Sequence, residues 1–326
     1  MTVQILWLAG AIITAVYAAK FLVDGGVALG HKLNIPSFII GAVIIGFGSS
    51  MPEFSVNIGA ALKGETGLAM GNILGSNLFN MAFSLGVLSL VSPLMVNRDA
   101  LVKDLPMHVI AALMVGVCGN QLYFDGINYH ELMPSHGIIF LCFFAIYMYY
   151  TVLEVGQQSP AKKPLHPSHA RKLNGEEILH AVRIPLYIVG GLAGLLWAGD
   201  KIVDSASAIA GHYGLQDHTI GLFIVGPGTS LPELVACIAA ARKRQTDMIL
   251  GNIIGSNIFN IFFTLGITAL ITPVPVDASL NNIIIANIAL AVMLWFGVLL
   301  TPSKNISRIL GAILLLGYFF YIGLSL

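Results

Sequence analysis

The sequence predicts an all-α integral membrane protein with about ten transmembrane helices, built as two inverted repeats of five helices each. Three observations support this fold class. Of the 326 residues, 56% are hydrophobic and only 10% are charged, whereas about 25% are charged in a typical soluble protein. Predominantly apolar runs recur along the chain at about the 20-residue length that crosses a bilayer. The third observation is an internal repeat, since the second half of the chain aligns with the first.

Ten apolar runs are expected to span the membrane. Backbone groups exposed to lipid must satisfy their own hydrogen bonds, so each run is predicted to be a helix. The first run lacks the basic start of a signal peptide, and we expect it to remain in the chain. The runs cover residues 2–23, 37–62, 68–91, 106–122, 136–154, 184–203, 218–241, 248–271, 283–301 and 307–325.

A polar linker divides the chain nearly in half. It covers residues 156–183 and separates a first five-helix repeat, 1–155, from a second, 184–326. If the N-terminus lies outside, 14 of the 16 Lys and Arg residues fall in or beside the inner connections. The positive-inside rule therefore predicts that both termini lie outside and that the linker is cytoplasmic. We expect the membrane to be the cell membrane, either a plasma membrane or an inner membrane.

The two halves repeat each other without a gap. Residues 41–86 and 221–266 are identical at 23 of 46 positions. The strongest blocks are GSSMPE at 48–53 with GTSLPE at 228–233, and GNILGSNLFN at 71–80 with GNIIGSNIFN at 251–260. Because five is an odd number of helices, the halves are predicted to enter the membrane in opposite senses. This plan is typical of secondary transporters, whose ion sites lie near the midplane where the repeats meet.

Glu53 and Glu233 are the only acidic residues deep inside the apolar runs. A charged side chain at the bilayer centre costs about 2.5–3.5 kcal/mol on insertion scales, and no Lys or Arg lies at comparable depth to pair with either glutamate. Pro52 and Pro232 precede them and are expected to open each helix. Opened backbone is tolerated at depth where it lines a cavity. We therefore predict that the two glutamates face a cation.

Hydroxyl, amide and carbonyl oxygens flank each glutamate. They come from Gly46, Ser49, Ser50, Ser76 and Asn80 in the first half and from Gly226, Thr229, Ser230, Ser256 and Asn260 in the second. Hard cations such as Ca2+ take six to eight oxygen ligands, whereas soft transition metals prefer sulfur or imidazole. The set contains neither, so Ca2+ or Na+ is the predicted cation. His108 lies just inside the start of its run and is expected to be an interfacial histidine.

The paired motifs GSSMPE…GSNLFN and GTSLPE…GSNIFN resemble the two alpha repeats of the sodium/calcium exchanger family, within the cation/Ca2+ exchanger superfamily, and the likeness spans essentially the whole chain. The resemblance implies that ions bind between helices 2, 3, 7 and 8, with Glu53 and Glu233 as shared carboxylates flanked by Asn80 and Asn260. It implies further hydroxyl and carbonyl ligands at Ser50, Ser230, Ser76, Ser256, Ser49, Thr229, Gly46 and Gly226. It also implies alternating access, in which helices 1 and 6 slide past the others while Na+ moves inward and Ca2+ outward.

The coupling ion remains open at the level of sequence. Many exchangers carry an aspartate where this chain has Asn80 or Asn260, so K+ linkage is possible and a Ca2+/H+ antiporter of the same superfamily is the nearest alternative. A passive cation channel is a remote one. An intramembrane enzyme is excluded because Ser50 and Ser230 have no base within reach. No cofactor and no nucleic acid are expected, so the predicted partners are the ions and the lipid bilayer, and the sequence does not identify a protein partner.

Overall fold

The computed structural model describes residues 2–32, 46–121, 130–158, 175–242, 246–276 and 278–325, and nearly all of them lie in helices. The prediction of an all-α fold is confirmed. Within these ranges, eight helices are long and apolar enough to cross a membrane, and Arg308–Gly323 is a shorter apolar helix. The eight are Thr2–Leu29, Thr66–Val91, Ala100–Cys118, Pro134–Leu153, Arg183–Tyr213, Asp217–Arg242, Ile249–Ile271 and Leu280–Leu300. The first part of the predicted span 37–62 lies outside the described residues.

The elements of the two halves follow one another in a similar order. In the first half they are α1 (Thr2–Lys32), α3 (Gly46–Gly48), α4 (Met51–Lys63), α5 (Thr66–Leu78), the π-helical η2 (Phe79–Ser84), α6 (Leu85–Val91), β1 (Leu94–Met95), the π-helical η3 (Ala100–Asp104), α7 (Leu105–Cys118), β2 (Glu131–Leu132) and α9 (Pro134–Gln158). In the second half they are α10 (Gly175–Tyr213), α11 (Asp217–Ile220), the π-helical η4 (Gly221–Val225), α12 (Gly226–Thr229), α13 (Leu231–Arg242), α14 (Thr246–Ile258), the π-helical η5 (Phe259–Leu265), α15 (Gly266–Ile271), β3 (Val274–Pro275), α16 (Ala278–Leu300), β4 (Asn305–Ile306) and α17 (Arg308–Ser325).

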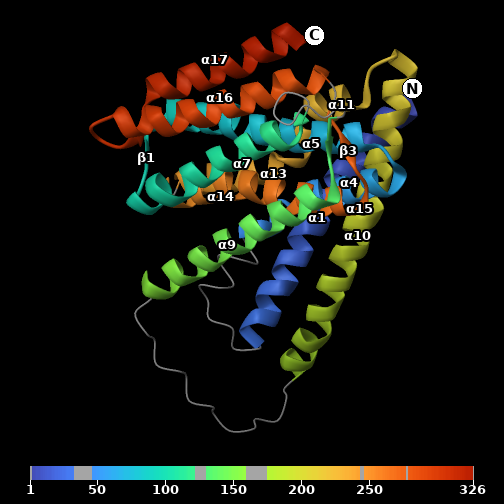
Figure 1. The fold of residues 1–326 in the computed structure, drawn as a ribbon. Coiled ribbons are helices and arrows are strands. Elements are labelled where there is room, and N and C mark those ends of the chain that lie inside the picture. The colour runs from blue at the N-terminus through green and yellow to red at the C-terminus, as the bar shows by residue number, and fades with distance from the viewer. Residues whose placement is uncertain are drawn as a thin grey trace.

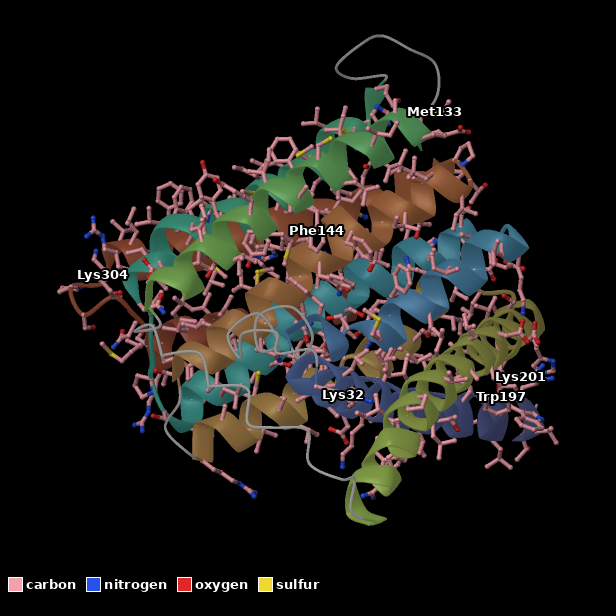
Figure 2. All side chains as sticks on the ribbon, turned by 90° about the horizontal axis from the view of Figure 1, so that it is seen from below. Lys32, Met133, Phe144, Trp197, Lys201 and Lys304 are labelled. Atoms are coloured by element: carbon pink, nitrogen blue, oxygen red, sulfur yellow. The ribbon has the colours of Figure 1, made fainter. Side chains whose placement is uncertain are left out.

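Two continuous helices form the centre of the molecule. One consists of α5, η2 and α6, and the other of α14, η5 and α15. In each of these two helices, 83% of the apolar stretch is buried inside the protein, whereas only 17–41% is buried in the other candidate membrane spans. Phe144 of α9 lies near the middle of Figure 2, and its ring centroid is 5.0 Å from that of Phe263 in η5. The two central helices therefore carry the buried core, and the remaining helices surround them.

The helices α1 and α10 lie side by side and extend together away from α16 and α17 (Figure 1). Small residues make this close approach possible. A Cβ added to Gly191 of α10 would lie 2.8 Å from the Ala18 carbonyl oxygen of α1 and 2.7 Å from the Leu22 nitrogen. Glycine at such positions lets two helix backbones approach closely. α1 and α10 therefore form a pair of their own beside the central helices.

Two short strand pairs show the directions of the central helices. β1, which follows α6, pairs with β4, and β2 pairs with β3, which follows α15. The helix α16 begins just after β3 and ends just before β4. At 1.5 Å per residue, its 23 residues separate the two strand pairs by about 34 Å. The central helices therefore end at opposite ends of α16, and they run in opposite directions.

Several helices are longer than the apolar runs predicted. α1 continues to Lys32 rather than to residue 23, and α9 and α10 extend into the predicted linker 156–183 from both sides, to Gln158 and from Gly175. Apolar length marks only the part of a helix that lies in hydrocarbon. Good helix formers such as those in GEEILHAVR at 175–183 can continue the helix beyond the membrane.

Candidate ion-binding site

Each half contains a helix break next to its glutamate. A turn at Ser49 and Ser50 separates α3 from α4, and Ser230 separates α12 from α13. Pro52 lies in the first turn of α4, and Pro232 is the second residue of α13. A proline is tolerated there because the first N–H groups of a helix have no partner inside it. The helices therefore open where the prolines predict that they open.

The breaks place both glutamates at the start of a helix. Glu53 lies in the first turn of α4 and Glu233 in the first turn of α13, where the helix dipole favours negative charge. Both side chains are completely buried. Ser230 Oγ donates a hydrogen bond to Glu53 Oε1 at 2.8 Å, and Ser50 Oγ donates one to Glu233 Oε1 at 3.0 Å. Each carboxylate is therefore held by a serine of the other half.

The central helices contribute a second hydroxyl to each carboxylate. Ser76 of α5 lies 3.5 Å from Glu53 Oε1, and Ser256 of α14 lies 3.5 Å from Glu233 Oε1. The second oxygen, Oε2, of each glutamate is buried and has no hydrogen-bond partner within the described part of the chain. One oxygen of each carboxylate is thus fixed by hydroxyl groups, and the other is free to bind a ligand.

Asn80 and Asn260 repeat this arrangement with their amide groups. Asn80 Nδ2 donates to Asn257 Oδ1 at 3.2 Å, and Asn260 Nδ2 donates to Asn77 Oδ1 at 3.1 Å. These bonds assign the orientation of each amide. Both Oδ1 atoms are buried and, among the residues that the structure describes, neither accepts a hydrogen bond. Two amide oxygens therefore join the two carboxylate oxygens as buried acceptors without a partner.

The asparagines that hold Asn80 and Asn260 also tie the central helices together. Asn77 Nδ2 donates to the Asn257 carbonyl, and Asn257 Nδ2 donates to the Asn77 carbonyl, both at 3.3 Å. His108 Nε2 lies 3.4 Å from Asn257 Nδ2, and its side chain is only 1% exposed. His108 is therefore buried against the central helices. The helix around it begins at Ala100 in η3 rather than at residue 106, so His108 lies about two turns inside its helix and not at its start.

A further layer of asparagines supports the helix breaks. Thr229 Oγ1 lies 3.2 Å from Asn72 Oδ1, and Ser49 Oγ lies 3.4 Å from Asn252 Oδ1. The Gly226 carbonyl oxygen lies 3.1 Å from Thr229 Oγ1 and 3.1 Å from Ser76 Oγ, so it is an alternative acceptor for each of these hydroxyl groups. The contacts to the asparagines repeat across the two halves, because Asn72 and Asn252 occupy equivalent positions in the two repeats, as do Ser49 and Thr229.

The structure brings most of the predicted site residues into one buried network. The residues joined directly or through an asparagine are Glu53, Glu233, Ser50, Ser230, Ser76, Ser256, Asn80, Asn260, Thr229, Gly226 and Ser49. Gly46 begins α3, and no described contact joins it to the glutamates. Sequence reasoning missed the supporting asparagines Asn72, Asn77, Asn252 and Asn257. Their identity in both repeats was the signal that could have revealed them.

The chemistry of this network suits a hard cation. Within the described ranges no group of three or more His, Cys, Asp and Glu side chains could hold a metal ion. The oxygens of the glutamates and of Asn80 and Asn260 that have no hydrogen-bond partner belong to carboxylate and amide groups. Such oxygens are the ligands that Ca2+ and similar cations prefer. The imidazole of His108 faces Asn257. The site can therefore bind a cation with oxygen ligands from both halves.

The chain is similar to members of a family of exchangers over nearly its whole length. Residues 3–153 and 183–326 match the profile of a family described as "Sodium/calcium exchanger protein". "Putative antiporter CaxA" of Alkalimonas amylolytica is 32% identical over 323 residues, which are 98% of both chains. "Sodium/calcium exchanger MaX1" of Methanosarcina acetivorans is 26% identical over 98% of this chain and 97% of its own.

A solved structure has the same fold. The sodium-calcium exchanger NCX_Mj, soaked with Na+ and Sr2+, superposes with a TM-score of 0.65 at 26% sequence identity. The match covers 98% of this chain and 97% of that one. The likeness therefore includes both halves and the region of the two helix breaks.

Proposed function

The chain belongs to the sodium/calcium exchanger family, and we propose that it carries Ca2+ across the membrane in exchange for Na+. It is an integral membrane protein of a transporter family, with apolar helices long enough to span a bilayer. One observation carries the proposal. Among the buried oxygens without hydrogen-bond partners, within the described residues, four come from two equivalent positions of each half: Glu53 and Glu233, and Asn80 and Asn260.

Charge supports Ca2+ as one of the two ions. Two ionised glutamates, Glu53 and Glu233, match the charge of one Ca2+. The two amide oxygens of Asn80 and Asn260 add ligands without adding charge. The hydroxyls and carbonyls that we propose as the remaining ligands belong to Ser50, Ser230, Ser76, Ser256, Ser49, Thr229, Gly46 and Gly226. The twelve residues together offer more oxygens than the six to eight that one Ca2+ takes.

Na+ as the second ion rests on the relatives. MaX1 is named a sodium/calcium exchanger, and NCX_Mj is described as a sodium-calcium exchanger. Na+ accepts the same neutral oxygens that complete a Ca2+ site, so one set of ligands can serve both ions in turn. Such competition for a single site is the simplest physical basis for exchange, since the protein then carries either ion but not both.

We also propose that ten helices span the membrane as two inverted repeats, with 1–155 and 184–326 as the repeats. Eight of the ten are the long helices described above. The ninth would be the helix that α3 and α4 form, and the tenth would be the shorter α17. The opposite directions of the central helices support this plan. The charge pattern supports termini outside and a cytoplasmic linker, and we place the protein in the cell membrane. Alternating access then exposes the site to one side at a time.

Glutamine substitutions test the proposal. In proteoliposomes with trapped Na+, Glu53→Gln and Glu233→Gln should each reduce 45Ca2+ uptake about 10–100-fold, because a charged ligand interaction of about 1.5–3 kcal/mol is lost. Glu131→Gln is the control, since Glu131 lies in β2, away from the network. Unchanged uptake in either glutamine variant of the site would contradict the proposed ligands.

The trapped ion separates the alternatives. Uptake driven by a pH gradient and not by Na+ would indicate a Ca2+/H+ antiporter. A requirement for both Na+ and K+ would indicate K+-linked exchange. Uptake that follows the Ca2+ gradient with no trapped counter-ion would indicate a passive cation channel.

A further inference from the structure

Within the described part of the chain, nine buried side-chain oxygens have no hydrogen-bond partner, and six of them form three pairs at equivalent positions of the two repeats. The other three belong to Asn120, Ser207 and Asn287 and have no such counterpart. Two pairs are the proposed ion ligands, Glu53 with Glu233 and Asn80 with Asn260. The third pair is Ser84 and Thr264, whose side chains are 0% exposed. The third pair therefore shares burial, the lack of a partner and repeat symmetry with the first two, although the proposed site does not include it.

The local helix geometry explains why these hydroxyls are free. A buried hydroxyl in a helix usually bonds to a carbonyl three or four residues earlier, as Ser89 does with Gly86 at 2.9 Å and Thr268 with Thr264 at 2.8 Å. Ser84 ends the π-helical η2, and Thr264 lies within the π-helical η5. Such π-helical turns change the carbonyl pattern and are frequent at functional sites.

Each hydroxyl lies one turn beyond a proposed ligand. Ser84 follows Asn80 by four residues, and Thr264 follows Asn260 by four, a spacing that places both side chains on the same face of a helix. Each helix therefore presents two buried oxygens without partners among the described residues: an amide Oδ1 and then a hydroxyl.

We infer that Ser84 and Thr264 are two further ligands of the transported ion, and that each forms with the preceding asparagine a two-oxygen station for Na+. The inference rests on the proposed function. Both oxygens of a station are neutral, so a station lacks the charge that holds Ca2+. A weakly held monovalent cation suits it, with water completing the ligand shell.

The two stations lie on opposite sides of the glutamates. The central helices meet at Asn77 and Asn257 and run in opposite directions. Moving four residues toward the C-terminus leads toward β1 on one helix and toward β3 on the other. One station therefore faces each end of the ion path, where it receives or releases Na+ as the central site opens to that side.

Measurement of Na+ dependence tests this inference. In proteoliposomes, the trapped Na+ concentration that gives half-maximal 45Ca2+ uptake should rise about tenfold in Ser84→Ala and in Thr264→Val, the order of effect expected for a lost hydroxyl ligand to a charge. Ser84→Thr and Thr264→Ser keep the hydroxyl and should restore the parent value. The matched controls are Ser89→Ala and Thr268→Val, which remove buried hydroxyls of the same helices that are already bonded.

Binding can also be measured without transport. Na+ should raise the unfolding temperature of the purified parent, because a ligand that binds only the folded state stabilises it. The rise should require about tenfold more Na+ in Ser84→Ala and Thr264→Val. A lower transport rate with an unchanged Na+ requirement in both measurements would overturn the inference, since packing alone would then explain the hydroxyls.

The outcomes separate this inference from the proposed function. If the parent takes up no Ca2+ against trapped Na+, or if protons alone drive uptake, Na+ exchange itself fails. If the parent exchanges Ca2+ for Na+ and Glu53→Gln abolishes it, while Ser84→Ala and Thr264→Val match their controls, the stations fail and the exchange mechanism stands.

Discussion

The helices α1 and α10 occupy the same position in the two repeats, yet they contact different parts of the molecule. α1 crosses both helix breaks, because a Cβ on Gly48 would collide with Val23 and one on Gly228 would lie 2.9 Å from Ile12. α10 lies along α4 instead. A Cβ on Gly199 would lie 2.6 Å from the Ser55 carbonyl oxygen. The two helices are thus equivalent in sequence position but not in packing.

The surfaces of α4 and α13 show the same inequality. Ser55 of α4 is 6% exposed beneath α10, whereas Val235, its counterpart on α13, is 65% exposed. A repeated sequence therefore does not decide which long helix covers which break. If transport alternates access, as we propose, the two repeats would exchange these roles during the cycle.

The glycines of the central helices extend the comparison. A Cβ on Gly71 of α5 would collide with the His218 carbonyl, and one on Gly75 would lie 2.5 Å from the Leu222 carbonyl oxygen. A Cβ on Gly251 of α14 would meet no atom within 4 Å among the described residues, and for Gly255 the nearest is Tyr147 Oη at 4.0 Å. The repeat equivalents of His218 and Leu222 are residues 38 and 42, which lie outside the described residues, so this backbone contact is described at α5.

The largest expected effect follows from that contact. Gly71→Ala should lower the free energy of unfolding by about 2 kcal/mol, because overpacking against a backbone costs about 1–3 kcal/mol and the gain in helix propensity is at most about 1 kcal/mol. Gly67→Ala on the same helix should keep or raise stability, because a Cβ there would lie at an ordinary contact distance of 3.6 Å from the His218 nitrogen. Thermal unfolding of the purified variants measures both. An equal loss of stability would mean that the close backbone contact at Gly71 does not decide how α5 packs.

A smaller effect is expected where α10 lies against α4. Gly199→Ala should lower the free energy of unfolding by about 1–2 kcal/mol, since its methyl group would press on the Ser55 backbone. Gly190→Ala on the same helix is the matched control, because a Cβ there meets no described atom within 4 Å. Ala19, at the same position in α1, already carries the methyl group. If both alanine variants unfold at the same temperature, α10 does not depend on close contact with α4.

These contrasts mark how far the sequence could predict the structure. The repeat identified Glu53 and Glu233 and predicted the helix breaks beside them, because charge and proline are rare in hydrocarbon and each needs a physical reason. It did not reveal Asn77 and Asn257, because amides that bond to each other leave no charge signal. The burial of His108 inside its helix was missed because an apolar run does not mark where a helix begins, and this helix begins at Ala100.

The packing of α1 and α10 could not be predicted for a different reason. Two segments with nearly the same pattern can occupy either of two arrangements, and the difference in free energy depends on many small contacts. Lys63 is an example of such a contact. It is one of the two basic residues that the predicted topology places outside the inner connections, and it pairs with the carboxylates of Asp200 and Asp204. A count of basic residues does not include these acidic partners.

The smallest expected effect concerns this ion pair between α4 and α10. Lys63 Nζ lies 2.7 Å from Asp204 Oδ1, while Lys201 Nζ lies 3.2 Å from Asp204 Oδ2 within α10 itself. The Lys63 side chain is 31% exposed and that of Asp204 49%, and exposed pairs contribute only about 0–1 kcal/mol.

Lys63→Met should therefore change the unfolding temperature little. It should alter the 45Ca2+ exchange rate by less than about fivefold, because the ion pairs of Lys63 join α4 to α10 and resist movement of one helix along the other. Lys201→Met, which removes a pair within one helix, should leave the rate unchanged. The difference between the two variants should disappear at 1 M salt, where screening extends over only about 3 Å. A rate change of the same size in both variants would mean that the charges act on the ion path rather than on the contact between the helices.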